Sequence, residues 1–239
     1  MSNKKLNKNN IKRFFESRAI NYDKKNPLKS VIYQDKNPSL AKNRDLFEKK
    51  KIKDLINFSK EDVVLDIGCG IGRWGEISTK VKKYVGIDYT EKFIKIAEST
   101  FKNDKNTHFV YGDAANFINT EVKYHSPYST IIIMGFFIYI DNKQGYDVLK
   151  QILEVSDKRC QIILKETIGV KNEIVLNNIW SDEMQTHYSG RYRTISQFKQ
   201  MFEEVLFEKG FKLFIDEKMF PDHLNNREDT TQHLFCLKR

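Results

Sequence analysis

Three glycines at the end of a short apolar run constrain this chain more than any other feature. Residues 63–75 read VVLDIGCGIGRWG, in which the apolar side chains give way to Gly68, Gly70 and Gly72. The pattern predicts a buried parallel strand, a tight turn and the start of a helix, which together open a nucleotide-binding α/β fold. Glycine at the turn lets the backbone approach a ligand where a Cβ atom would collide with it.

Asp66, two residues before the first glycine, distinguishes between two classes of ligand. Residues 70–75 also fit the dinucleotide pattern GxGxxG, which by itself is a weak signal. A carboxylate at the carboxyl end of this strand would repel a pyrophosphate and attract a cation. The sequence therefore favours a positively charged ligand, and a dinucleotide-dependent oxidoreductase stays as an alternative.

With this acid in place, the motif resembles the first motif of the class I S-adenosylmethionine-dependent methyltransferases, which has the form hhD/ExGxGxG. S-adenosylmethionine carries a sulfonium and an ammonium group, so it is a ligand of the favoured kind. The resemblance implies that this cofactor binds at Asp66, Gly68 and Gly70, with Arg73 beside them.

A second acid supports the resemblance. Residues 84–88 read YVGID and end in Asp88, which follows Gly68 by 20 residues. An acid at this spacing accepts hydrogen bonds from ribose hydroxyls in both the methyltransferase and the dinucleotide fold. Asp88 is therefore expected to bind the cofactor in either case.

The resemblance continues to about residue 166. Residues 108–113 read HFVYGD, and the family holds adenine with such an acid and the next backbone amide, here Asp113 and Ala114. Further strands are predicted at residues 128–135 and 161–166. The resemblance also implies that cofactor-binding residues include Tyr89, Met134, Tyr22 and Arg44.

The alternation of strands and helices predicts a Rossmann-like α/β fold. We expect a seven-stranded, mostly parallel sheet with helices on both faces over residues 58–239. Residues 211–219 and 231–237 would form an antiparallel C-terminal hairpin at one sheet edge. Helices are expected, among others, at residues 73–81, 91–102, 142–156 and 194–209.

A separate segment precedes this domain. Residues 1–57 are predicted to form a disordered, polar tail over residues 1–10 and a helical cap, with helices at residues 11–19 and 39–57. In the family such helices lie over the cofactor as a lid.

Residues 167–193 lack a strict period and are expected to form a long irregular insertion. Loops of this length are usually functional. The resemblance implies that the insertion and the cap together build the acceptor pocket. The substrate-binding candidates are Tyr33, Trp180, Tyr188, Arg191 and Arg193.

Methylation of a hydroxyl group requires a base that removes its proton. His187, in the insertion, is the first candidate, and Glu166 and His223 are the reserves. An acceptor that is already anionic would need no base. No metal is expected, because the three cysteines lack metal-ligand spacing and the turn after the fourth predicted strand carries no acidic cluster.

The charge is distributed unevenly. The chain has a net charge of +9, and residues 1–60 hold 17 Lys and Arg against 6 Asp and Glu. A basic segment of this kind fits nucleic acid or an anionic small molecule, although a lysine-rich composition overall would also produce it. The N-terminus has no apolar signal segment, and no apolar run reaches the ~20 residues of a membrane span, so a cytoplasmic protein is expected.

The features together favour a methyltransferase that O-methylates a small polar, anionic acceptor such as a sugar or a nucleotide-linked metabolite. Arg191 and Arg193 would suit a pyrophosphate group. The chain also looks like methyltransferases of bacterial surface-polysaccharide loci. Methylation of RNA through the basic segment is the alternative acceptor class, although residues 134–139 (MGFFIY) lack the proline-containing turn of nucleobase amine methyltransferases.

Overall fold

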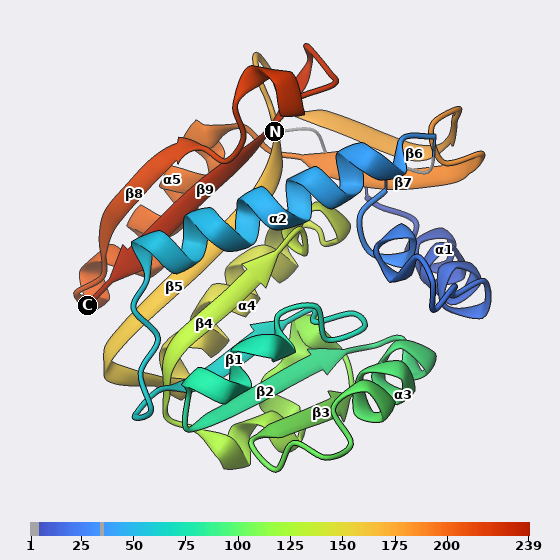
Figure 1. The fold of residues 1–239 in the computed structure, drawn as a ribbon. Helices are drawn as coiled ribbons and strands as arrows, with labels where there is room; N and C mark the ends of the chain where they lie inside the picture. The colour runs from blue at the N-terminus through green and yellow to red at the C-terminus, as the bar shows by residue number, and fades with distance from the viewer. Residues whose placement is uncertain (1–4, 34–35) are drawn as a thin grey trace.

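A seven-stranded sheet forms the centre of the computed structural model, which describes residues 5–33 and 36–239 (Figure 1). The strand order is β3-β2-β1-β4-β5-β9-β8. The parallel strands are β1 (Val63–Ile67), β2 (Lys83–Asp88), β3 (Thr107–Tyr111), β4 (Tyr128–Met134) and β5 (Ser156–Gly169). The antiparallel strands at one edge are β9 (Thr230–Lys238) and β8 (Lys212–Lys218). The predicted fold, including its C-terminal hairpin, is confirmed.

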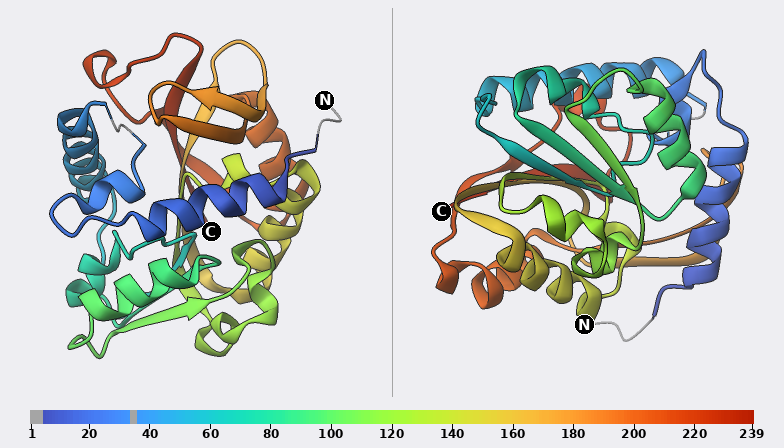
Figure 2. Two further views of the ribbon diagram at one scale, coloured as in Figure 1. Left: turned by 90° about the vertical axis from the view of Figure 1, so that its right-hand side faces the viewer. Right: turned by 90° about the horizontal axis from the view of Figure 1, so that it is seen from below.

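Helices cover both faces of the sheet (Figure 2). On one face lie α4 (Asn142–Val155) and α5 (Ile195–Val205), and on the other lie α2 (Pro38–Leu55) and α3 (Glu91–Thr100). Successive side chains of a strand point to opposite faces. In β1, Leu65 and Ile67 therefore pack toward α4 and α5, while Val64 packs toward α2 and α3. Because both faces are covered, β1 reads as a continuous apolar run and not as an alternating one.

Ordered structure in the N-terminal segment begins at a lower residue number than the sequence predicted. The first helix, α1 (Lys8–Ile20), begins at Asn7, whose side chain accepts a hydrogen bond from the backbone N–H of Asn10 at 3.2 Å. Leu6 is only 6% exposed. The prediction of a disordered tail is therefore wrong for residues 5–10, and residues 1–4 lie outside the described part of the chain. A short 3-10 helix, η1 (Pro27–Ser30), connects α1 to α2.

Residues 167–193 form a hairpin and not the predicted irregular insertion. β5 runs on to Gly169, and β6 (Ile174–Ser181) and β7 (Thr186–Tyr192) then pair as a separate two-stranded antiparallel sheet. The pairing register shifts between Leu176 and Ile179, where Asn178 has a positive φ of 58°. Such a bulge interrupts the period of two by which a strand is recognised in a sequence.

A second difference concerns residues 73–81. Only the short 3-10 helix η2 (Gly75–Lys80) forms there, because few residues separate the glycine turn from β2. The other helices predicted in the domain agree with the structure within a few residues, and α5 begins at the predicted cap Thr194, which forms a capping box with Gln197.

Two buried charged residues hold the turn that follows β4. Glu166 is 0% exposed, and its Oε1 accepts hydrogen bonds from the backbone N–H groups of Phe136 and Phe137 at 2.8 and 2.7 Å. Arg193 donates to the carbonyl oxygens of Phe137 and Ile140 at 2.6 and 2.8 Å. Both residues therefore satisfy backbone groups that would otherwise be buried without partners.

Among the described helices, none is long and apolar enough to cross a membrane.

Replacing Arg193 should destabilise the protein. Arg193→Leu leaves the two buried carbonyl groups without donors, at about 1–3 kcal/mol each. We expect a free energy of unfolding lower by about 2–5 kcal/mol in urea denaturation. The matched control is Arg159→Leu, since Arg159 is exposed. Equal stability of the two variants would contradict the role given to Arg193.

Glu166 should make stability depend on pH. Burial raises the pKa of Glu166 from its ordinary 4.5 to about 7, although the backbone hydrogen bonds oppose this. The folded protein thus holds this proton more tightly than the unfolded chain, and the resulting stabilisation is lost as the pH rises through 7. Glutamine keeps an acceptor oxygen and has no such proton. Relative to wild type, Glu166→Gln should therefore gain up to about 3 kcal/mol of stability between about pH 5 and about pH 8.

Urea denaturation at the two pH values measures this gain, with Glu154→Gln on the exposed side of α4 as the control. A pH-independent difference between Glu166→Gln and wild type would show that Glu166 does not titrate in this range.

Candidate active site

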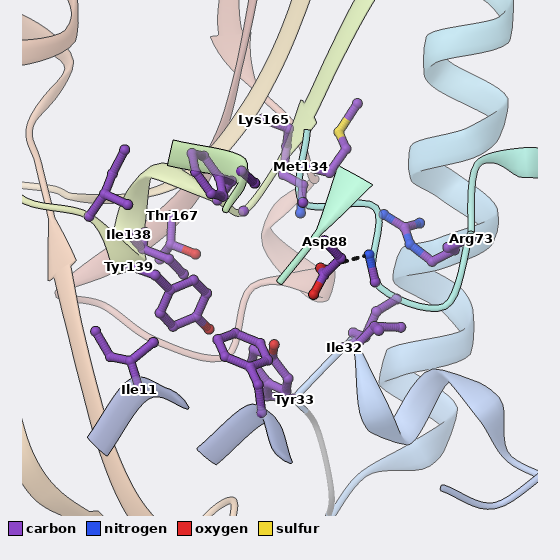
Figure 3. Close-up of a pocket in the computed structure, with 18 of the residues that line it drawn as sticks. Ile11, Ile32, Tyr33, Arg73, Asp88, Met134, Ile138, Tyr139, Lys165 and Thr167 are labelled. Carbon is purple, nitrogen blue, oxygen red and sulfur yellow. Dashed lines mark hydrogen bonds between the residues drawn. The ribbon is translucent and has the colours of Figure 1, made fainter. Parts of the chain in front are cut away.

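A cavity of about 810 Å³ lies at the carboxyl ends of the parallel strands (Figure 3). In open α/β sheets this edge is where ligands bind. The volume lies within the ~300–1,000 Å³ of small-molecule sites. The cavity, called the pocket below, is lined on one side by the glycine loop and the ends of β1, β2 and β4. On the other side it is lined by α1, residues 31–33 and the β6–β7 hairpin.

Asp88 ties the glycine loop to the end of β2. Its Oδ2 accepts a hydrogen bond from the backbone N–H of Gly70 at 3.0 Å, and its Oδ1 accepts from Thr90 at 2.8 Å. Each carboxylate oxygen has a further lone pair for a ligand hydroxyl. Gly70 has a positive φ of 56°, and a Cβ atom built there would lie 3.0 Å from Val31 of the cap. The loop conformation and its closeness to the cap therefore both require glycine.

Asp66 is a buried acid that forms no ion pair among the described residues. It is 2% exposed, and its Oδ2 accepts a hydrogen bond from the Tyr84 hydroxyl. Burial raises the pKa of Asp66 to about 7, although the Tyr84 hydrogen bond and the charge of Arg73 oppose the shift. A cation bound next to Asp66 would favour its ionised form. The residue thus suits a cationic ligand, as its position in the sequence indicated.

Arg73 lines the pocket, but its charge is used within the protein. Its guanidinium donates to Asp45 at 2.6 Å and to Glu48, both on α2. Lys165, from β5, reaches the other oxygen of Glu48 at 3.1 Å. Burial alone would raise the pKa of Glu48, but Arg73 and Lys165 hold it at about 2. This ionic cluster joins the cap helix α2 to the glycine loop and to β5.

Most of the other predicted cofactor residues meet in the same pocket. Besides Asp66, Asp88 and the glycines, its lining includes Tyr89, Asp113, Ala114, Met134 and Arg44. Tyr22 does not line it and packs instead beside Ala19, Ile71 and Phe93. The structure therefore brings together every predicted cofactor residue except Tyr22.

The opposite end of the pocket is aromatic. Of the substrate-binding candidates, Tyr33 and Tyr188 line it, together with Phe15 and Tyr139, which the sequence analysis missed. The ring centroids of Phe15 and Tyr139 are 4.8 Å apart, and the hydroxyl oxygens of Tyr139 and Tyr188 are 3.3 Å apart. This end of the pocket is called the tyrosine end below.

One signal could have revealed the contribution of α1. Lys8, Ile11, Lys12 and Phe15 all line the pocket and are spaced i, i+3, i+4 and i+7. Residues at this spacing share one face of a helix. The sequence alone did not say that this face would meet the pocket, because the partner is distant in the chain.

The three predicted bases lie outside the pocket. His187 is exposed on β7, where its ring packs against Trp180, which is exposed as well. Because strand neighbours point to opposite sides, Tyr188 faces the pocket and His187 faces away from it. His223 is exposed on η7 (Asp222–Leu224), and Glu166 is the turn-holding residue described above. The prediction that these residues act as the base is therefore not supported by their positions.

The two predicted anion-binding arginines also lie outside the pocket. Arg191 is 3% exposed and pairs with Glu173 at 2.8 Å, and Arg193 binds the turn after β4. Both guanidinium groups are thus directed into the protein and not toward a ligand. In residues 5–33 and 36–239, no three side chains cluster in a way that could hold a metal ion.

Comparisons with known proteins find methyltransferases. Residues 64–158 match a family model described as a methyltransferase domain. The demethylmenaquinone methyltransferase of Lactococcus lactis subsp. lactis (strain IL1403) is 27% identical over 173 residues, which are 68% of this chain and 60% of the relative. That of Staphylococcus carnosus (strain TM300) is 26% identical over 118 residues, or 48% and 44% of the two chains. The chain thus matches less than two thirds of the length of these curated relatives.

Solved structures share the fold at low identity. Phosphoethanolamine N-methyltransferase 1 of Haemonchus contortus, solved with phosphoethanolamine and S-adenosylhomocysteine, has a TM-score of 0.70 at 15% identity over 97% of this chain and 48% of that chain. A DhpI complex with S-adenosylhomocysteine has a TM-score of 0.64 at 11% identity over 97% and 96%. The family match over residues 64–158, together with the motif around Asp66, supports a class I S-adenosylmethionine-dependent methyltransferase.

Proposed function

We propose that this protein transfers the methyl group of S-adenosylmethionine to an oxygen atom of a small anionic acceptor. The observation that carries the proposal is the pocket itself. One cavity extends from the two acids Asp66 and Asp88 to the tyrosine end, and α1 lines it on the side opposite the sheet. A cofactor at the acids and an acceptor at the tyrosine end would then lie in one continuous cavity.

The cofactor end has groups for each part of S-adenosylmethionine. Asp88 would accept the ribose hydroxyls, Asp113 and Ala114 would hold adenine, and Asp66 would face the cationic part. When bound, the cofactor supplies an activated methyl group on a sulfonium. The contribution of the chain is to align the two reactants and to exclude water between them.

The tyrosine end supports a small acceptor over RNA. α1 lies along the wall of the pocket, and the basic residues Lys8 and Lys12 are among those that line it. Part of the basic charge that suggested a nucleic-acid partner therefore belongs to the pocket. The related proteins are named for different acceptors, a demethylmenaquinone and phosphoethanolamine, so the acceptor class is inferred from the pocket and not from the names.

Calorimetry and an activity screen test the proposal. The protein should bind S-adenosylhomocysteine and not NAD. Screening phosphorylated, phosphonylated and carboxylated metabolites for release of S-adenosylhomocysteine should then identify acceptors. Tight binding of NAD without binding of S-adenosylhomocysteine would refute the proposal, and turnover with RNA alone would replace the small acceptor by a nucleic acid.

Loss of Asp88 should weaken cofactor binding. In Asp88→Ala the ribose hydroxyls lose a charged partner and the Gly70 N–H loses its acceptor, which together cost about 1.5–3 kcal/mol. Calorimetric affinity for S-adenosylhomocysteine should fall by roughly 10- to 100-fold. Asp222→Ala, at an exposed position on η7, is the control. Equal affinities would show that Asp88 does not contact the cofactor.

His187 should be dispensable. A general base contributes roughly 10²–10⁴ to turnover, but His187 lies outside the pocket. We expect His187→Ala to release S-adenosylhomocysteine at nearly the wild-type rate with any acceptor found in the screen. A loss of the size expected for a base would require β7 to turn over in the working enzyme.

A further inference from the structure

We propose that the acceptor binds with its reacting oxygen already negatively charged, and that the hydroxyl group of Tyr139 donates a hydrogen bond to this oxyanion. The inference rests on the proposed function and specifies its acceptor chemistry. Phosphate, phosphonate and carboxylate groups share the required oxyanion.

The first observation is the pair of tyrosine hydroxyls at the tyrosine end. The Tyr188 hydroxyl is placed to donate to the Tyr139 oxygen across 3.3 Å. Two hydroxyl groups that form one hydrogen bond leave one proton for another acceptor. With Tyr188 as donor, this is the proton of Tyr139, and Tyr139 donates no hydrogen bond to another residue in the described part of the chain. Figure 3 shows Tyr139 in the pocket beside Ile11 and Thr167.

The two phenols can donate but not act as bases. Burial raises the pKa of Tyr139 and of Tyr188 well above the ordinary value, and the neighbouring Tyr33 and Tyr192 raise both further through charge. Both hydroxyls thus stay protonated at neutral pH. A hydrogen bond from such a buried donor is strongest to an ionised acceptor.

The second observation is that the pocket offers no suitable base. No histidine of the described residues lines it. Asp66, Asp88 and Glu48 are engaged at the cofactor end, as described above. Asp113, at the same end, accepts a hydrogen bond from the backbone N–H of Ala115 at 2.9 Å. The carboxylate that lines the pocket from the hairpin, Glu183, accepts a hydrogen bond from the backbone N–H of Lys36 at 3.1 Å. A neutral hydroxyl acceptor would need its proton removed, whereas an oxyanion would not.

The third observation is the charge on α1. Lys8 forms no ion pair within residues 5–33 and 36–239, and Lys12 has only the exposed Glu16 at 3.8 Å. Both lysines lie on the helix face that lines the pocket. Their positive charge would attract an anionic acceptor and repel an amine.

The reaction balances without a proton. A lone pair of the oxyanion forms the new O–CH₃ bond while the C–S bond breaks, and its electron pair passes to sulfur. The sulfonium becomes a neutral thioether, the oxyanion loses its negative charge, and no proton is released. Since Tyr139 binds the oxygen most strongly before transfer, its loss should raise KM more than it lowers kcat.

Calorimetry on the protein saturated with S-adenosylhomocysteine tests the inference. The probes are phenylphosphonate and benzoate, compared with benzyl alcohol and benzylamine, which have similar rings without the anion. We expect the two anions to bind and the alcohol and the amine to bind far more weakly. Tyr139→Phe should weaken anion binding by roughly 10- to 100-fold. Tyr124→Phe makes the same change on an exposed side chain outside the pocket and is the control.

Three results would overturn the inference: benzylamine binding more tightly than the anions, absence of anion binding, or anion binding that Tyr139→Phe leaves unchanged. The comparison of probes uses the wild-type protein, so it tests the preference for an anion even if the Tyr139→Phe variant does not fold. A protein that fails to bind S-adenosylhomocysteine would contradict the proposed function instead. A 100-fold loss of turnover in Glu183→Gln would identify a base and also overturn the inference.

Discussion

Parallel pairing of the central strands is the constraint on which the rest of this molecule depends. β1 pairs with β2 on one side and with β4 on the other, so that Ile67 lies beside Ile87 and Ile133. The three strands therefore end together, and the chain leaves each of them at the same edge of the sheet. Asp66, Asp88 and Met134 come from three distant parts of the sequence and reach one pocket for this reason. Helices on both faces keep the strands buried, and the pocket lies at this edge.

The cap is attached to this edge by charge at one end and by aromatic contacts at the other. At the charged end, both Arg73 and Lys165 pair with Glu48 of α2. Arg73 also pairs with Asp45 of the same helix. Buried ion pairs contribute little net stability, because their desolvation offsets their attraction. They form only when the charged groups lie in a defined arrangement, however, and here they fix the position of α2 relative to the glycine loop. The rings of Phe15 and Tyr139 bring α1 to the other end of the pocket.

The distribution of charge around the pocket differs from the distribution along the sequence. The arginines that suggested an anion site, Arg191 and Arg193, serve the hairpin and the turn after β4. The positive charge at the pocket wall comes instead from Lys8 and Lys12 of α1. An anionic acceptor is still favoured, but its charge would meet lysines and tyrosine hydroxyls, and the methyl transfer would proceed without a protein base.

The sequence by itself determined the sheet and the cofactor end. Continuous apolar runs mark strands that are covered on both faces, and the spacing between glycines and acids places Asp66 and Asp88 at strand ends, so both could be predicted from local pattern. The hairpin could not, because the bulge at Asn178 interrupts its period. Only the tertiary structure decided that Tyr188 faces the pocket while His187 faces solvent, since a strand's alternation gives two faces but not which one is inward. The same holds for Glu166, Arg193 and the pocket-facing side of α1, whose partners lie far away in the sequence and are selected by packing.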